Sequence, residues 1–145
     1  MADSHREKIF MALEGILKTT PGIGDVHRGR IDPLDIQLYP AVWLLPGIDD
    51  VVEYIGNMIL RQMTVFTFLW IRTQGNNLHK TLETFIPRVQ KVLAADHTLD
   101  GLTIDVTETS THEPFPLNET QTEAGVIVEH QILYRVLRQD PYAQA

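Results

Sequence analysis

Cysteine is absent from the 145 residues of this chain. That absence excludes disulfide bonds, thiolate metal sites and cysteine nucleophiles, so packing and backbone pairing alone must hold the fold together. It also agrees with a reducing compartment such as the cytoplasm. Serine is scarce as well, because Ser4 and Ser110 are the only two, and neither lies in the G-x-S-x-G pattern of a hydrolase nucleophile elbow.

Basic residues are in the minority, with 12 Lys and Arg against 19 Asp and Glu and a formal net charge of −7. A protein that grips DNA phosphates needs clustered Lys and Arg, so we expect no strong DNA binding. Long apolar runs are missing too: Met63 to Ile71 is interrupted by Thr64 and Thr67 and is far shorter than the ~20 residues of a membrane helix. The polar N-terminus lacks the apolar segment of a signal peptide. These features predict a soluble protein made in the cytoplasm.

Two amphipathic helices are predicted, over about residues 4–18 and 77–95. Ser4 and Glu7 have the spacing of a capping box, in which each side chain bonds to a free backbone N–H at the other position. The second helix follows the breaker Gln74-Gly75-Asn76-Asn77, and Pro87 should kink it or split it in two. The apolar stripes consist of Ile9, Phe10, Leu13, Ile16 and Leu17 in the first helix, and of Leu78, Leu82, Phe85, Ile86, Val89, Val92 and Leu93 in the second.

Strand patterns occupy most of the remaining chain. The predicted strands are Asp25–Arg30, Ala41–Leu45, Val51–Ile55, Met58–Arg72, Leu102–Thr107 and Ala124–Leu137. Met58–Arg72 is apolar on both faces, which is typical of a central strand that is covered on both sides. The last two strands are expected to form an antiparallel hairpin with a long, polar, projecting loop, followed by a flexible tail over about residues 139–145.

The fold class predicted from these elements is α+β. We expect a single domain over residues 1–145 with a mostly antiparallel sheet, two main helices packed on it and a long C-terminal β-hairpin. The domain is long enough to bury about two-thirds of the surface that its unfolded chain exposes.

Candidate catalytic and metal residues are few. Asp49 and Asp50 follow Pro46-Gly47, where an exposed turn is favoured over a carboxylate pair for acid–base chemistry. Asp96, His97, Asp100 and His112 are the residues that a metal site would use, but they lack the helical spacing of an H-E-x-x-H site, and solvated loops are favoured. The sequence therefore predicts no catalytic residue, no metal ligand and no cofactor.

Phe66, Phe68 and Trp70 share one face of the strongest strand. Such a trio can serve as a base-stacking platform for single-stranded nucleic acid. Those platforms are usually flanked by many basic residues, whereas only Arg61 and Arg72 bracket this run. Packing in a core or in an interface between subunits is the favoured interpretation.

Three segments in order carry a resemblance to a known family. They are "ILKTTPGIGDVHRGRI", "PAVWLLPG" and "VQKVLAADHTLDGLTIDV", and a closing strand near Tyr134-Arg135 follows them. Together they resemble the tail terminator or tail completion proteins of long-tailed bacteriophages, of the minor tail protein U type, from about Lys8 to Leu137. The chain departs from the family in a longer loop, Glu108 to Glu123, and in an inserted region, Asp49 to Asn57.

The resemblance implies a non-enzymatic virion protein that forms a homo-oligomeric ring, usually hexameric, at the head-proximal end of the tail. Such a ring ends polymerisation of the tail tube protein and docks the head–tail connector or neck protein, with the tail sheath as a further partner if the tail is contractile. DNA would pass through the lumen without specific binding, and no membrane is involved. Assembly would take place in the host cytoplasm.

The candidate interface residues are Arg28, Arg30, Asp49, Asp50, Phe66, Phe68, Trp70, His112 and Phe115. Asp25, Asp32, Asp35, Asp49 and Asp50 are candidates for an acidic channel lining that repels passing DNA. Charge reversal at Arg28 and Arg30 should weaken ring assembly or docking. The alternatives are a neck, head–tail connector or tail-tube subunit and, in different classes, a small-ligand or metal-dependent enzyme domain or a nucleic-acid-binding accessory protein.

Overall fold

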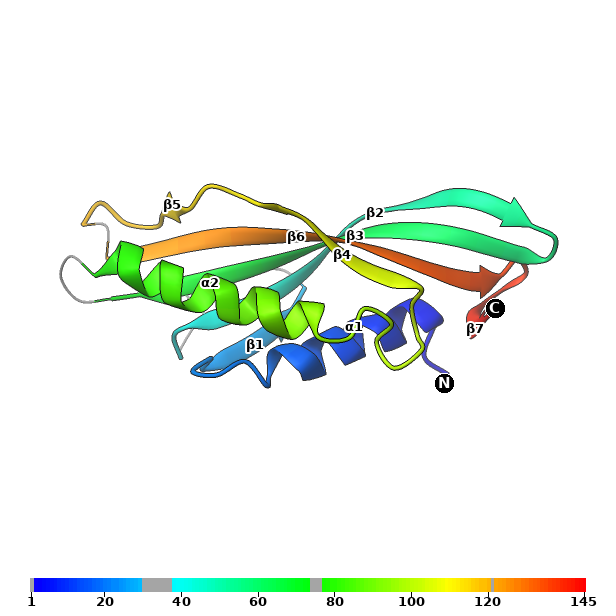
Figure 1. Ribbon diagram of the computed structural model, residues 1–145, viewed down its shortest axis with the longest axis horizontal. Helices are drawn as coiled ribbons and strands as arrows, with labels where there is room; N and C mark the ends of the chain where they lie inside the picture. Colours follow the sequence, from blue (N-terminus) through cyan, green and yellow to red (C-terminus); the bar gives the residue numbers. More distant parts are fainter. Residues whose placement is uncertain (1, 30–37, 74–76, 121) are drawn as a thin grey trace.

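The computed structural model describes residues 2–29, 38–73, 77–120 and 122–145. One curved sheet has the strand order β1-β2-β3-β6-β4, and β5 and β7 also pair with β6. All pairs are antiparallel except β1–β2. Both helices lie on the same side of the sheet (Figure 1). This arrangement confirms the predicted α+β class. The elements are α1 (His5–Leu17), β1 (Asp25–Arg28), β2 (Ala41–Ile55), β3 (Met58–Arg72), α2 (Leu78–Ala94), β4 (Asp105–Thr111), β5 (Phe115–Pro116), β6 (Glu123–Leu137) and β7 (Asp140–Gln144).

The two helices begin and continue for different reasons. At α1, Ser4 Oγ accepts a hydrogen bond from the backbone N–H of Glu7 at 3.0 Å, as the capping pattern predicts. The other half of the predicted capping box is absent, because the Glu7 carboxylate binds Arg28. At α2, the side chain of Asn77 makes no capping bond, and the helix passes through Pro87 without splitting. Packing of its apolar stripe on the sheet supports that helix.

The main core lies between the helices and one face of the sheet. Directly opposite residues of antiparallel strands share a face, and the odd-numbered residues of β3 pair with the even-numbered residues of β6. These two sets point toward α1 and α2. The core consists mainly of Ile9, Phe10, Leu13 and Leu17 of α1, Leu82, Ile86, Val89 and Leu93 of α2, and Val42, Leu44, Met63, Val65, Leu69, Val126, Ile132 and Tyr134 of the sheet.

β2 is a single strand of 15 residues, so the prediction of two short strands separated by a turn is wrong. Asp49 and Asp50 lie within it, opposite Met63 and Gln62 of β3. The register shifts between Pro46 and Asp49, which is a β-bulge that absorbs the Pro46-Gly47 pair. Proline is tolerated at this position because β1 has already ended and β2 is an edge strand here.

The C-terminal third differs from prediction at three points. The loop before β6 does not project, because it runs along β6, with His112 and Leu117 donating backbone hydrogen bonds to it and Phe115 pairing with Gly125. The expected flexible tail forms β7, which pairs with the end of β6. β4 begins at Asp105 rather than Leu102, after left-handed residues that include Leu99.

Candidate subunit interface

The β2–β3 hairpin extends past the end of the helical layer (Figure 1), and its distal part, residues 48–61, forms an arm. Its turn is the two-residue pair Gly56-Asn57, where Gly56 has a φ of +58°. Tight hairpin turns need such left-handed residues to match the strand twist. The turn fixes the register of Ile55 against Met58.

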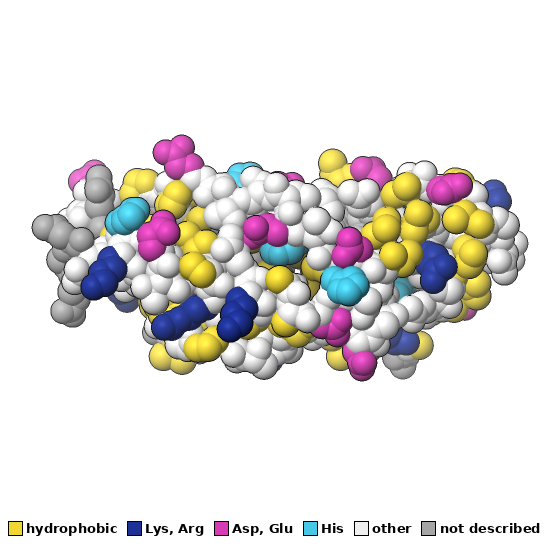
Figure 2. Space-filling view, in the orientation of Figure 1, with side chains coloured by type: hydrophobic (Ala, Val, Ile, Leu, Met, Phe, Trp, Pro, Cys, Tyr) yellow, Lys and Arg dark blue, Asp and Glu magenta, His cyan; other side chains and the backbone are white. Residues whose placement is uncertain are grey.

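The arm carries a group of exposed apolar side chains. Isolated exposed apolar residues are normal, but a contiguous group marks an interaction surface. Figure 2 shows hydrophobic side chains gathered at the end of the molecule where the arm lies. The residues are Ile48, Val51, Val52, Tyr54 and Ile55, with exposed fractions of 70%, 39%, 50%, 55% and 43%.

The outer edge of β2 is open along the arm. β1 pairs with β2 only from Ala41 to Leu44, and beyond Leu44 no described strand pairs with that edge. Unpaired backbone N–H and C=O groups on an edge are a template for another chain. Edge strands that must stay single are usually short, bulged or rich in charge. The arm is bulged and carries the exposed acids Asp50 and Glu53, but it is also long and exposes five large apolar side chains, which favours association.

A buried polar cluster anchors the base of the arm. The bulge at Pro46 turns Asp49 toward the helix side, where its carboxylate is 10% exposed. Tyr134 of β6 donates its hydroxyl to Asp49 Oδ2. Arg6 Nη1 of α1 lies 3.4 Å from Asp49 Oδ2, and Arg61 Nη1 of β3 lies 3.7 Å from Asp49 Oδ1. Burial is the larger cause, and the hydrogen bond to Asp49 the second, of a pKa of Tyr134 that lies well above its ordinary value.

This cluster corrects the predicted role of Asp49. The residue is not in an exposed turn, and its carboxylate joins α1, β3 and β6 at the root of the arm. Asp50, its neighbour, is exposed on β2. Asp25 pairs with His27 at 2.8 Å, and Asp32 and Asp35 lie outside the described residues. The acidic channel lining therefore stays a prediction that no longer includes Asp49.

Arg28 of β1 is bound within its own chain. Its guanidinium donates to both carboxylate oxygens of Glu7 at 2.7 and 2.6 Å, and it lies 5.3 Å over the ring of Phe10. The bidentate bond lowers the pKa of Glu7. Arg28 thus joins β1 to α1 beside the point where the edge of β2 opens. Arg30, the second basic residue predicted here, lies outside the described residues.

The aromatic trio lies on the sheet face away from the helices. Trp70 is 4% exposed, and Phe66 and Phe68 are half-buried. Phe68 stacks on Trp70 with ring centroids 5.8 Å apart, and Phe115 meets Trp70 edge-on at 5.9 Å. A Cβ at Gly125 would lie 2.7 Å from both the Phe115 and the Trp70 rings, so this close packing requires glycine. Phe115 therefore covers Trp70, and only Phe66 and Phe68 of the trio stay partly exposed.

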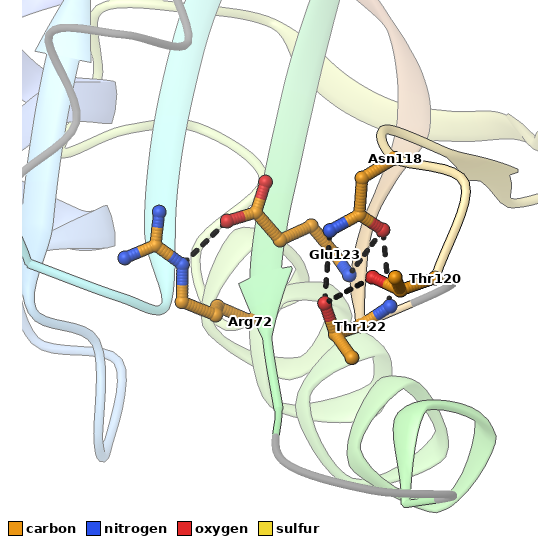
Figure 3. A network of polar contacts seen from close by, with 5 residues as sticks. All are labelled: Arg72, Asn118, Thr120, Thr122 and Glu123. Carbon is orange, nitrogen blue, oxygen red and sulfur yellow. Dashed lines mark hydrogen bonds and ion pairs between the residues drawn. The ribbon is translucent and has the colours of Figure 1, made fainter.

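A polar network holds the turn that follows β5 against the end of the sheet (Figure 3). Asn118 Oδ1 accepts from the backbone N–H of Thr122 at 3.0 Å, and Asn118 Nδ2 donates to Thr122 Oγ1 at 2.8 Å. Arg72 Nε lies 2.5 Å from Glu123 Oε1, and its guanidinium lies 4.2 Å over the ring of Tyr39. The network fixes the segment that carries Phe115 over the aromatic face.

The remaining polar candidates lie apart. His112 contacts Glu129 at 3.3 Å, and Asp96 binds Thr98 and Asp100 within its own loop. Over residues 2–29, 38–73, 77–120 and 122–145, no three His, Asp or Glu side chains are placed to hold a metal ion. Within that same part of the chain, no helix is long and apolar enough to span a membrane.

Comparisons with known proteins give distant structural similarity only. No protein-family model matches the chain, and no curated protein matches it. A chain from a structure described as "Virion of native gene transfer agent (GTA) particle" is 8% identical, with 90% of each chain covered and a TM-score of 0.49. Similarity of this degree is too low to assign a function.

Sequence patterns alone do not predict most of the exposed apolar surface of the arm. It divides the apolar residues of the arm between a predicted turn and a predicted short strand, so it does not predict their shared exposure. A Gly-Asn pair between two apolar segments is a hairpin signal, and it joins Ile55 to Met58. If antiparallel pairing with Met58–Arg72 is extended outward from that turn, it predicts one long strand, β2, in place of two short ones.

Proposed function

We propose that this chain is a structural subunit of a phage-type virion, a tail terminator that closes into a ring at the head-proximal end of the tail tube. One observation carries the proposal: the arm exposes a group of large apolar side chains beside an open strand edge. Another protein surface satisfies both features at once, because it removes apolar area from water and pairs the free backbone groups.

The proposal of a terminator role rests on the family resemblance in addition to this surface. The three resembling segments fall on the end of α1 with β1, on the start of β2, and on the end of α2 with the loop that leads to β4. In the proposed role, copies associate side by side, the tail tube protein binds below the ring, and the head–tail connector binds above it. The protein acts without turnover and functions in the virion after assembly in the cytoplasm.

Mass in solution is the first test. Native mass spectrometry and light scattering over a range of concentrations should give one closed oligomer of fixed copy number, and negative-stain microscopy should show rings. Long filaments would instead assign the chain to the tail tube. A monomer at high concentration would contradict the proposal.

A second test addresses the terminator role itself. Added to its purified tail tube protein during polymerisation, the chain should shorten the tubes and appear at one end of each. Rings that leave tube length unchanged but bind isolated heads would support a neck or connector subunit in its place.

A further inference from the structure

The open edge of the arm carries its acids on one face. Directly opposite residues of paired strands share a face, so the register of β2 against β3 assigns each edge residue to a face. Asp50, Glu53 and Ile55 lie opposite even-numbered residues of β3, which face away from the helices. Val51 and Tyr54 lie opposite odd-numbered residues of β3 and therefore face the helix side. The edge thus presents carboxylates on one face and only apolar or aromatic side chains at these two positions of the other.

The bulge in the arm sets the two acids at the spacing of successive residues on one face. The register shifts between Val51 and Glu53, so Asp50 and Glu53 lie opposite Gln62 and Leu60, which are two positions apart on β3. Residues two positions apart on a strand point to the same face. A strand added to this edge therefore meets both carboxylates with two successive side chains of a single face.

These two carboxylates are not neutralised within the chain. Asp50 and Glu53 are exposed, and no ion pair joins either of them to another described residue. Arg61 lies on the opposite face of the arm, and Arg135 shares their face but lies on β6, with β3 between it and the edge. Arg138 lies 4.7 Å over an aromatic ring of the arm. The edge therefore keeps an uncompensated negative charge.

The charge of this edge disfavours a second copy of the same strand as its partner. Antiparallel pairing of two β2 edges brings the acids of both copies onto one face of adjacent strands, where like charges are destabilising. The outer edge of β4, the last strand in the sheet order, carries Asp105 and Glu108. Neither β2 nor β4 contains Lys or Arg. Charged residues on an edge are a common means of preventing sheets from pairing with their own copies.

We propose that the open edge of the arm binds an extended segment of a different protein, in which Lys or Arg alternates with apolar residues. The segment adds a strand beside β2, and its backbone pairs with the free N–H and C=O groups of the edge. Its cations lie beside Asp50 and Glu53, and its apolar side chains lie beside Val51 and Tyr54 on the helix side. This inference rests on the proposed structural role and deepens it, because it assigns the arm to a partner of the ring rather than to the next copy.

Peptide binding to the full chain tests this assignment. The probes are two short fluorescent peptides of equal length, one that alternates lysine with valine and one that alternates glutamate with valine. By fluorescence anisotropy at low salt, the lysine peptide should bind about fivefold more tightly or better, because exposed attractive pairs become repulsive in the glutamate peptide. The preference should shrink as added salt screens the charges. Equal affinities, or no binding of either peptide, would overturn the assignment.

A peptide with a blocked backbone separates strand addition from simple charge attraction. N-methylation of every amide in the lysine peptide keeps its charges and side chains but removes its backbone donors, so binding should be lost. Hydrogen–deuterium exchange should become slower at residues 48–55 when the unmethylated peptide binds. Equal binding of the methylated peptide, or slower exchange only outside the arm, would contradict pairing with the edge.

A charge-reversed arm provides an independent measurement. The double variant Asp50→Lys/Glu53→Lys should bind the glutamate peptide more tightly than the lysine peptide. The matched control Glu83→Lys/Glu113→Lys changes the net charge by the same amount at exposed positions outside the arm, and it should still prefer the lysine peptide. Reversal of the preference in both double variants would attribute it to net charge alone and overturn the assignment.

The outcomes separate this inference from the proposed function. Closed oligomers of the unmodified chain that prefer neither peptide would overturn the assignment of the arm and leave the ring intact. A monomer that binds the lysine peptide through residues 48–55 would overturn the ring and support the assignment of the arm. A monomer that prefers neither peptide would overturn both.

Discussion

Removing the hydroxyl of Tyr134 tests the polar anchor at the base of the arm. The hydroxyl is buried and donates to the Asp49 carboxylate, and a hydrogen bond to a charged group contributes about 1.5–3 kcal/mol to stability. Tyr134→Phe should therefore lower the free energy of unfolding by about that amount. With a urea slope of about 1–3 kcal/mol per M, the midpoint should fall by roughly 1 M. The control Tyr54→Phe removes a hydroxyl from an exposed ring on the arm and should cost less than about 0.5 kcal/mol.

Urea unfolding followed by tryptophan fluorescence is a suitable assay, because Trp43 and Trp70 are 5% and 4% exposed. All variants should be compared at one protein concentration, since association adds to apparent stability. In an Asp49→Ala background, Tyr134→Phe should cost almost nothing, which gives a coupling energy of about 1.5–3 kcal/mol. Equal losses for Tyr134→Phe and Tyr54→Phe, or additive losses in the double variant, would refute the anchor.

Three further predictions concern single residues, two in the sheet and one on α1. Burial lowers the pKa of His130 below its ordinary 6.5, so the folded chain binds fewer protons than the unfolded chain just below that pH. The free energy of unfolding should fall as pH drops below about 6.5, by at most about 1.4 kcal/mol per pH unit. Urea titrations at about pH 5.5 and about pH 7.5 should show a smaller difference in this free energy for His130→Gln than for the unmodified chain. Gly125→Ala should cost about 1–3 kcal/mol by forcing Phe115 and Trp70 apart, measured as a lower thermal midpoint. A Cβ at Gly15 on α1 would meet open space. Gly15→Ala should therefore add about 0.5–1 kcal/mol of stability, measured as a higher thermal midpoint. A lower midpoint would contradict the open surroundings of Gly15.

Local patterns predict the elements whose environment is set by nearby residues. Ser4 caps α1 because the hydrogen bond spans only three residues, and Met58–Arg72 is recognisable because apolar residues occupy both faces. The full length of β2 escapes such patterns because Pro46-Gly47 is a strong breaker in isolation. Proline interrupts a strand only where its missing N–H would pair with a neighbouring strand. At Pro46 no such N–H is needed, because β1 ends before it, and where β1 ends depends on the tertiary structure.

The candidate interface is predictable only in part for the same reason. Asp49 looks like a turn residue until the bulge brings it to Arg6, 43 positions away in sequence, and to Tyr134, 85 positions away. Exposure of Val52 and Tyr54 depends on where the helices end above the sheet, which no local pattern encodes. The polar composition of β7 favours a flexible tail, whereas its strand form depends on pairing with β6.

The two ends of the chain lie close to each other, near the root of the arm (Figure 1). β7 contacts α1 there, and Gln144 bonds to the carbonyl of Gly101. An affinity tag fused to either end would therefore stand beside the surface proposed to bind a partner and mask part of it. A tag inserted in the turn after β5, at the opposite end of the molecule, would leave that surface free for purification and assembly studies.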